Sequence, residues 1–270
     1  MSLAIAFKGP EGIVLAADSR VTLTAQLAAG GETTSHFDNA TKLLSVQGQP
    51  YVGIVTYGAG AIGSPGPRTA HGFTPEFEAQ LSAKFPERTT VLEIATELGE
   101  FYNQQWQQGG MPAVGTPGFA PMVFLVAGFD VAEAYGKVFE ISVPTAPAPV
   151  EQTPGDFGVT FGGQNELVAR ILNGVEPRVL ELAKDELKLT DVQAGALYQR
   201  LRQDLAAPIP YQFLPLQDCV DLATFLVNMT PAVQGWTVGV RGVGGAVDVA
   251  TLTRTEGFRG IQQKHIQVKE

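Results

Sequence analysis

The chain begins with two short apolar runs joined by a tight turn. The segments Leu3–Lys8 and Ile13–Ala17 are rich in Ile, Val, Leu and Ala, and the sequence Gly-Pro-Glu-Gly separates them. Short apolar runs bounded by Gly and Pro are typical of β-strands, and a connection of this length predicts a hairpin. Its register places Asp18 opposite residue 3, at the same end of the ribbon as Ser2. The fold therefore starts with a sheet, and a carboxylate is expected near the first residues.

Apolar spacing divides the rest of the chain into blocks of strands and helices. Strands are predicted at Lys42–Val46, Tyr51–Tyr57, Val123–Phe129, Lys137–Val143, Thr237–Val240 and Val247–Leu252. Helices are predicted at Pro75–Lys84, Val91–Trp106, Asn165–Asn173, Val179–Leu187 and Gln217–Met229. Loops are expected in the Pro- and Gly-rich segments 24–40, 60–75, 107–121 and 144–154. Helices segregated between blocks of antiparallel strands favour a layered α+β domain with two sheets enclosed by helices over a parallel βαβ sheet.

The composition is that of a folded chain with a substantial core. Hydrophobic residues make up 44% of the 270 residues, and charged residues only 17%, below the roughly 25% of an average protein. We find no internal repeat, no heptad pattern and no segment with the composition of a domain linker. The sequence therefore predicts one domain that spans residues 1–270.

The net charge and the hydropathy of the chain argue against two classes of partner, nucleic acids and membranes. The chain carries 18 Lys and Arg against 27 Asp and Glu, so its net charge of −9 repels phosphate backbones and anionic lipid surfaces. No apolar run reaches the roughly 18 residues that a membrane helix needs. We therefore expect a protein without a nucleic-acid partner or a membrane segment. The first residues lack the pattern of a secretory signal, which favours the cytoplasm.

Few residues are available for metal or redox chemistry. Cys219 is the only cysteine, so no intrachain disulfide can form. The three histidines, His36, His71 and His265, lack the spacing of zinc ligands. The Gly-Gly pairs at 162–163 and 244–245 lack the strand–turn–helix spacing of a nucleotide-binding loop. The sequence predicts no metal and no cofactor.

Ser2 offers a nucleophile of a different kind. Removal of Met1 leaves a hydroxyl and a free α-amino group on the same residue. An α-amine has a pKa near ~7.7–8.0, so it can accept the hydroxyl proton close to neutral pH. This is the arrangement of enzymes that use an N-terminal Thr or Ser as nucleophile. Such a site needs no histidine, and Lys42, which opens a strand, is a candidate partner for Asp18.

The segment from Gly12 to Thr22, GIVLAADSRVT, resembles the second strand of proteasome β-type subunits, which are N-terminal nucleophile hydrolases. With Ser2 as the first mature residue, Asp18 falls where the family motif has its aspartate, and the pattern Asp-x-Arg-x-Thr continues through Arg20. The segment Lys42-Leu43-Leu44-Ser45-Val46 resembles the strand that follows the catalytic lysine of the family. Gly58, in Tyr57-Gly58-Ala59, lies where the family has the glycine whose N–H stabilises an oxyanion.

The resemblance implies a fold, a reaction and an assembly. The implied fold is a four-layer αββα sandwich of two antiparallel sheets flanked by helices. The implied catalytic residues are Ser2, Asp18, Lys42, Arg20 and Gly58, with Lys42 lowering the pKa of the Ser2 hydroxyl and Asp18 holding Lys42. Among these proteins the chain is most similar to bacterial proteasome homologues. We therefore expect a self-compartmentalising endopeptidase that cleaves unfolded polypeptides or peptides inside a homo-oligomeric ring.

The chain departs from the family pattern at two places. The family has a Ser after a Gly near the third helix, where this chain has Gly162-Gly163-Gln164. It also has Asp-x-x-Ser near the last strands, where this chain has Val240-Arg241-Gly242-Val243. Two alternatives therefore remain open: a catalytically silent ring scaffold, and an N-terminal nucleophile amidase or transpeptidase that acts on a small substrate.

Overall fold

The computed structural model describes residues 2–26, 31–63, 66–116, 119–239 and 241–264. The chain forms two compact units. The first contains Met1–Gly163 and Tyr211–Glu270, and the second contains Gln164–Pro210. All the candidate site residues lie in the first unit, and the prediction of a single domain stays a prediction.

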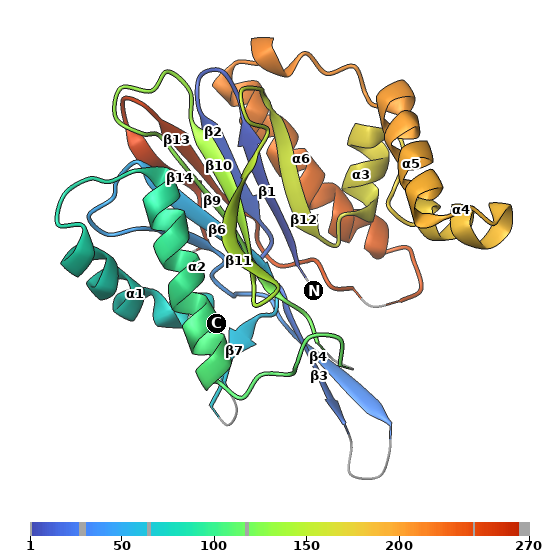
Figure 1. Cartoon of the computed structure of the whole chain (residues 1–270), viewed down its shortest axis with the longest axis horizontal. Coiled ribbons are helices and arrows are strands. Elements are labelled where there is room, and N and C mark those ends of the chain that lie inside the picture. The colour runs from blue at the N-terminus through green and yellow to red at the C-terminus, as the bar shows by residue number, and fades with distance from the viewer. Residues whose placement is uncertain (1, 27–30, 64–65, 117–118, 240, 265–270) are drawn as a thin grey trace, which may run out of the picture. The chain divides into compact units, whose positions relative to one another are not determined.

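Two five-stranded antiparallel sheets form the centre of the first unit (Figure 1). The first sheet has the order β12-β1-β2-β13-β14, with strands Gly158–Gly163, Leu3–Lys8, Ile13–Ala17, Asp248–Thr253 and Gly257–Gln262. The second sheet has the order β11-β10-β9-β6-β5, with strands Ala146–Gln152, Lys137–Val143, Met122–Gly128, Val52–Gly58 and Leu43–Ser45. In the register of the first hairpin, Ala4 pairs with Ala17, which confirms that residue 3 lies opposite Asp18.

An apolar core joins the two sheets. Alternate side chains of β1 and β2, including Ala6 and Leu15, pack in one cluster with Val55 of β6 and Leu125 of β9. Because successive side chains of a strand point to opposite faces, the other half of each strand faces the helices. The sheet contents confirm the prediction of antiparallel strands combined with helices.

Helices cover the outer faces of these sheets. The helices α1 (Ala70–Lys84) and α2 (Val91–Gln108) share a core with the second sheet, in which Tyr102 contacts Phe124 at 4.5 Å between ring centroids. α2 begins at a capping box, in which the Thr90 side chain accepts the Glu93 N–H and the Glu93 side chain accepts the Thr90 N–H. The helix α6 (Leu216–Gln234) runs along β1 and β2 of the first sheet (Figure 1).

Shorter elements complete the first unit. The strands β3 (Val21–Gln26) and β4 (Glu32–Phe37) form a separate hairpin that continues from the end of β2, and β7 (Ala61–Ile62) pairs with β8 (Arg68–Thr69). A 3₁₀ turn, η1, spans Tyr211–Phe213. No helix in the described part of the chain is long and apolar enough to cross a membrane.

The second unit is helical. It consists of α3 (Glu166–Asn173), α4 (Val179–Leu187) and α5 (Asp191–Leu205). Gly174 ends α3 with φ +69°, where a Cβ would lie 2.2 Å from the carbonyl oxygen of Leu205. Glycine at this position therefore permits the close approach of the two helix ends.

Two predicted elements are wrong. The segment 144–154, predicted as a loop, contains the strand β11, which pairs only with β10 and so forms a sheet edge. Proline lacks an N–H donor and is tolerated at an edge, which is why the Pro-rich sequence is misleading. The predicted strand Thr237–Val240 is not a strand over residues 237–239, where Trp236 and Val238 are exposed, and Val240 lies outside the described residues.

Further elements were not predicted as such, among them β4, β7, β8, β12 and α5. The segment 24–40, predicted as a loop, contributes β4 and the end of β3. The helix α5 has few apolar residues, and its sequence signal is the capping box of Thr190 and Gln193 at its start. Tertiary pairing and capping, rather than an apolar pattern, stabilise these elements.

Candidate functional site

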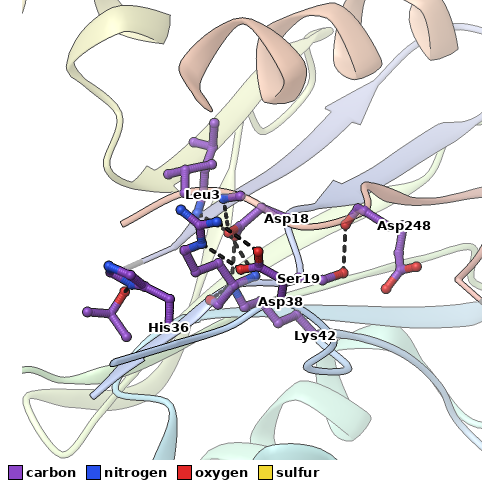
Figure 2. Close-up of polar contacts among 12 residues, drawn as sticks. Leu3, Asp18, Ser19, His36, Asp38, Lys42 and Asp248 are labelled. Carbon is purple, nitrogen blue, oxygen red and sulfur yellow. Dashed lines mark hydrogen bonds and ion pairs between the residues drawn. The ribbon is translucent and has the colours of Figure 1, made fainter. Parts of the chain in front are cut away.

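Asp18 is the centre of a buried hydrogen-bond cluster at the open end of the β1–β2 hairpin (Figure 2). Its Oδ1 accepts the Leu3 N–H at 3.0 Å and the Lys42 Nζ at 2.6 Å. Its Oδ2 accepts the Arg20 N–H at 3.1 Å and the Gly244 N–H at 3.0 Å. The side chain is 1% exposed, so each bond replaces a lost bond to water. These contacts settle the direction of the Asp18 side chain, which the strand register alone left undetermined.

Lys42 lies directly before β5 and extends into the same cluster. Besides the bond to Asp18, its Nζ donates to the carbonyl oxygen of Arg20 at 2.6 Å. The side chain is 6% exposed, and this burial lowers the pKa of Lys42, while the charge of Asp18 opposes the shift. The carbonyl oxygen of Lys42 accepts the Thr56 N–H, which fixes the residue to β6. The result is a desolvated cation held by one carboxylate.

Arg20 lines neither of the two cavities that Ser2 lines, and it joins two loops. Its guanidinium forms a bidentate pair with Asp38, with distances of 2.6 and 2.8 Å, and this hydrogen bonding raises the pKa of Arg20. The remaining Nη donates to the carbonyl oxygen of Arg241 at 3.1 Å. A Cβ at Gly244 would lie 2.5 Å from the guanidinium carbon. The sequence analysis did not single out Asp38, because an acidic residue directly after a strand is a weak signal.

Ser19 is a second residue that sequence reasoning missed. It is fully buried, and its hydroxyl donates to the carbonyl oxygen of Ala246 at 2.6 Å. Its backbone N–H donates to the carbonyl oxygen of Gly244 at 3.0 Å. Ser19 therefore fastens the segment before β13 to the end of β2.

Ser2 directly precedes Leu3, whose N–H donates to Asp18. It is 5% exposed and lines a cavity of about 220 Å³ together with Gly58. It also lines, with Lys42, a smaller recess of about 20 Å³. The cluster and the cavity are therefore adjacent, and Ser2 borders both Lys42 and open space.

The backbone of Gly58 has an unusual conformation at the end of β6. Its φ is +86°, and a Cβ would lie 2.1 Å from the carbonyl oxygen of Pro121. Along β6, the Thr56 N–H bonds to β5 through Lys42, and the Ala59 N–H bonds to Pro121 beside β9. Because N–H groups alternate between the two sides of a strand, the N–H of Gly58 points to the Lys42 side. Gly58 also lines the cavity.

The five residues predicted from the sequence meet in one region. Asp18, Lys42 and Arg20 share direct hydrogen bonds, and Ser2 and Gly58 border the adjoining cavity. At Gly163, where the resemblance places the serine of the family, φ is +95° and the residue pairs with Leu3. A Cβ there would lie 1.9 Å from the carbonyl oxygen of Ser2, so this backbone leaves no room for a side chain.

Comparison of the sequence with known protein families finds no match, and comparison with curated proteins also finds none. The structure is similar to a solved structure of a mutant of Anbu from Hyphomicrobium sp. strain MC1. The TM-score is 0.56 at 14% sequence identity, and the match covers 98% of this chain and 86% of that one. At this identity the likeness concerns the fold. The chain therefore shares its fold with this Anbu structure.

Proposed function

We propose that the chain is a proteasome-like N-terminal nucleophile hydrolase that cleaves peptide bonds with Ser2, after removal of Met1. The observation that carries the proposal is the position of Ser2 between the buried Asp18–Lys42 pair and an open cavity. In this proposal the first unit and the second unit form one domain, and the two sheets with their helices are the four-layer αββα sandwich of these enzymes.

The proposed reaction has two half-steps. The Ser2 hydroxyl attacks the peptide carbonyl carbon, and its proton passes to the α-amine of Ser2, directly or through a water. The positive charge of Lys42 favours the ionised hydroxyl, and Asp18 keeps Lys42 charged and in place. The C–N bond then breaks, the leaving amine takes the proton, and a water hydrolyses the acyl-serine ester.

Gly58 supplies the oxyanion donor in this scheme. Its N–H points to the side of β6 on which Lys42 lies, and Gly58 lines the cavity beside Ser2. One such donor contributes about 10²–10³ in kcat. Arg20 acts as a positioning residue, because its pair with Asp38 and its bond to the Arg241 carbonyl hold the loops around Asp18.

The proposed substrate is an unfolded polypeptide, and the proposed assembly is a homo-oligomeric ring in the cytoplasm. These follow from the resemblance of GIVLAADSRVT and Lys42–Val46 to proteasome β-type subunits. The alternative is a ring scaffold without activity, which the absence of a side chain at Gly163 favours, since no hydroxyl supports the Ser2 amine from that position.

Hydrolysis of a denatured protein tests the proposal. The wild-type chain, produced with an untagged N-terminus, is incubated with unfolded, fluorescently labelled casein, and the mass of the particle is measured by light scattering. We expect peptide release from a particle of several subunits, and loss of release in the Ser2→Ala variant at unchanged particle mass. Release that persists in Ser2→Ala contradicts the proposed nucleophile, and a ring without release supports the scaffold.

A further inference from the structure

A second buried ion pair lies in the same unit as Asp18 and Lys42, and the proposed reaction does not use it. It joins Asp248, the first residue of β13, to Lys264, which follows β14. The side chain of Asp248 is 5% exposed and that of Lys264 is 15% exposed. The removal of two charges from water costs about as much as their attraction returns, so stability alone does not explain this pair.

Asp248 lies directly across from the residue before Asp18. In the register of β13 and β2, Asp248 pairs with Ala17. Residues directly opposite each other in an antiparallel pair project to the same face. Ala17 packs in the cluster between the two sheets together with Leu43, the residue after Lys42. The Asp248 carboxylate therefore lies on the inner face of the first sheet, and this face packs against the sheet to which Lys42 is connected.

Lys264 occupies both carboxylate oxygens of Asp248. Its backbone N–H donates to Oδ1 at 3.0 Å, and its Nζ donates to Oδ2. The side chain of Gln262 donates to the carbonyl oxygen of Val247 at 2.8 Å, which fastens the same segment to the start of β13. Backbone contacts as well as charge therefore hold Lys264 against Asp248.

The ammonium of Lys42 has one donor left for the Ser2 side. Described residues accept two of its three N–H groups, namely Asp18 and the carbonyl oxygen of Arg20, both at 2.6 Å. Lys42 and Ser2 both line the recess of about 20 Å³. Burial lowers the pKa of Lys42 most, the charges of Asp18 and Asp248 raise it, and the charge of Lys264 lowers it. The second ion pair is therefore close enough to act on Lys42.

The charged groups around Lys42 come from separate segments of the chain. They are Asp18 at the end of β2, Arg20 and Asp38 on either side of the β3–β4 hairpin, Asp248 on β13, Lys264 after β14 and the α-amine of Ser2. Each of the three carboxylates has a cation as its partner. A carboxylate without its partner would attract the Lys42 ammonium in this buried region. The pairing of Asp248 therefore decides whether one carboxylate or two compete for Lys42.

We propose that Lys264 is a positioning residue of the Ser2 site, which engages Asp248 and so leaves the Lys42 ammonium to Asp18 and Ser2. The inference rests on the proposed function for the reaction, whereas the arrangement of charges does not require catalysis. Without Lys264, the Asp248 carboxylate competes with Asp18, and the Lys42 ammonium moves away from Ser2.

Titration of the lysine side chains tests the arrangement without turnover. The protein carries Ser2→Ala and lysine labelled with ¹³C at Cε, and the NMR signal of Lys42 is assigned by its absence in Lys42→Met. We expect Lys42 to bind its proton about tenfold more tightly in Lys264→Met, which loses a cation and frees a carboxylate. We expect weaker proton binding in Asp248→Asn, which leaves the Lys264 charge unopposed. No change in either variant, or changes in the same direction, overturns the proposal.

Two further variants separate charge from packing. Asp248→Asn/Lys264→Met removes both charges and is expected to return the proton affinity of Lys42 towards that of the wild type. The control is Lys137→Met, which breaks the pair with Asp130 at the end of the second sheet that lies away from Gly58. It is expected to leave the Lys42 titration unchanged. A change in Lys137→Met as large as that in Lys264→Met would contradict a specific role for Lys264.

The rate of inactivation by a peptide epoxyketone separates this inference from the proposed function. With Ser2 in place, Lys264→Met is expected to lower the maximal rate about tenfold and to move the alkaline limb to higher pH. The double variant is expected to recover both. A wild-type rate and pH profile in Lys264→Met, or no recovery in the double variant, overturns the inference alone. Changes in the Lys42 titration without inactivation of any protein overturn the proposed function and leave the charge arrangement standing.

Discussion

The carboxylate of Asp18 accepts hydrogen bonds from three backbone N–H groups and from the Lys42 ammonium. One side chain thus joins the start of β1, the end of β2, the residue before β5 and the segment before β13. The sequence predicted the pairing of Asp18 with Lys42, because a buried carboxylate after an apolar strand needs a partner. It did not predict the Gly244 donor, because that contact joins residues 226 positions apart and leaves no local pattern.

Removal of the Asp18 carboxylate is expected to destabilise the fold strongly. In Asp18→Ala the Lys42 charge stays buried without its partner, which costs about 3–5 kcal/mol. Urea unfolding of both proteins measures this loss. The control is Glu256→Ala, which breaks an exposed pair with Arg259 and is expected to cost about 1 kcal/mol or less. Similar losses in the two variants would contradict the structural role of Asp18.

The lowered pKa of Lys42 gives a pH dependence with a defined sign. Burial favours the neutral amine, so the pKa of Lys42 lies below 10.5. Native Lys42 therefore binds fewer protons than the unfolded residue between its native pKa and 10.5, and its contribution to stability rises with pH across that window. Subtracting the pH profile of Lys42→Met unfolding from that of the wild type isolates this contribution. A difference that falls with pH would contradict the burial of the cation.

The rate of the proposed reaction is expected to rise and then fall as the pH increases. The acid limb follows the α-amine near a pKa of ~7.7–8.0, because the amine must be neutral to accept the hydroxyl proton. The alkaline limb follows Lys42 and lies below pH 10.5, because neutral Lys42 no longer favours the ionised hydroxyl. The rate of inactivation by a peptide epoxyketone, measured from pH 6 to 10.5, checks both limbs. A rate that continues to rise to pH 10.5 would exclude a role for the Lys42 charge.

At the scale of elements, most apolar strands and helices were predictable, whereas the Pro-rich edge strand β11 was not. The strands β1, β2 and β10 have the predicted bounds, since their buried apolar runs are continuous or alternate regularly. β11 was missed because its prolines and exposed residues are compatible with a sheet edge and with a loop alike. Edge pairing depends on a neighbour that the local sequence does not contain.

The end of β6 provides a test at this scale. Gly58→Ala places a Cβ at a positive φ and 2.1 Å from the Pro121 carbonyl oxygen, so it is expected to destabilise by about 1–3 kcal/mol and to move the Gly58 N–H. The control is Gly72→Ala inside α1, where a Cβ meets nothing closer than 3.5 Å. This control is expected to stabilise by about 0.5–1 kcal/mol. Chemical denaturation of both variants measures the difference, and a neutral Gly58→Ala would contradict the described backbone.

The reactivity of the Cys219 thiol tests the contact between α6 and the β1–β2 hairpin. Its side chain is buried on α6, and burial raises the pKa of the thiol to about 11. We therefore expect no reaction with a thiol reagent such as dithionitrobenzoate at pH 7.5 in the native state, and one equivalent in urea. The native thiol does not react because it is protonated and inaccessible to the reagent. Rapid native reaction would show that α6 does not cover β1 and β2 as described.

At the scale of the whole molecule, the fold and the site come from different kinds of information. The likeness to Anbu at a TM-score of 0.56 concerns the arrangement of elements, whereas the site depends on single residues such as Ser2 and Lys42. The sequence motif predicted where Asp18, Arg20 and Lys42 would meet. It did not predict the cavity beside Ser2, because the lining of this cavity combines residues of β3, β6, α2 and the α2–β9 connection, which lie far apart in the sequence.

The central claim is that Ser2, with its own free amine, is the nucleophile. Its most direct test is the intact mass of the protein, made with an untagged N-terminus, before and after incubation with a peptide epoxyketone. The account predicts loss of Met1 and one covalent adduct that fragmentation locates on Ser2, with no adduct in Ser2→Ala. Retention of Met1, or an exposed Ser2 that stays unmodified at saturating reagent, would contradict the account and leave the fold as that of a catalytically silent scaffold.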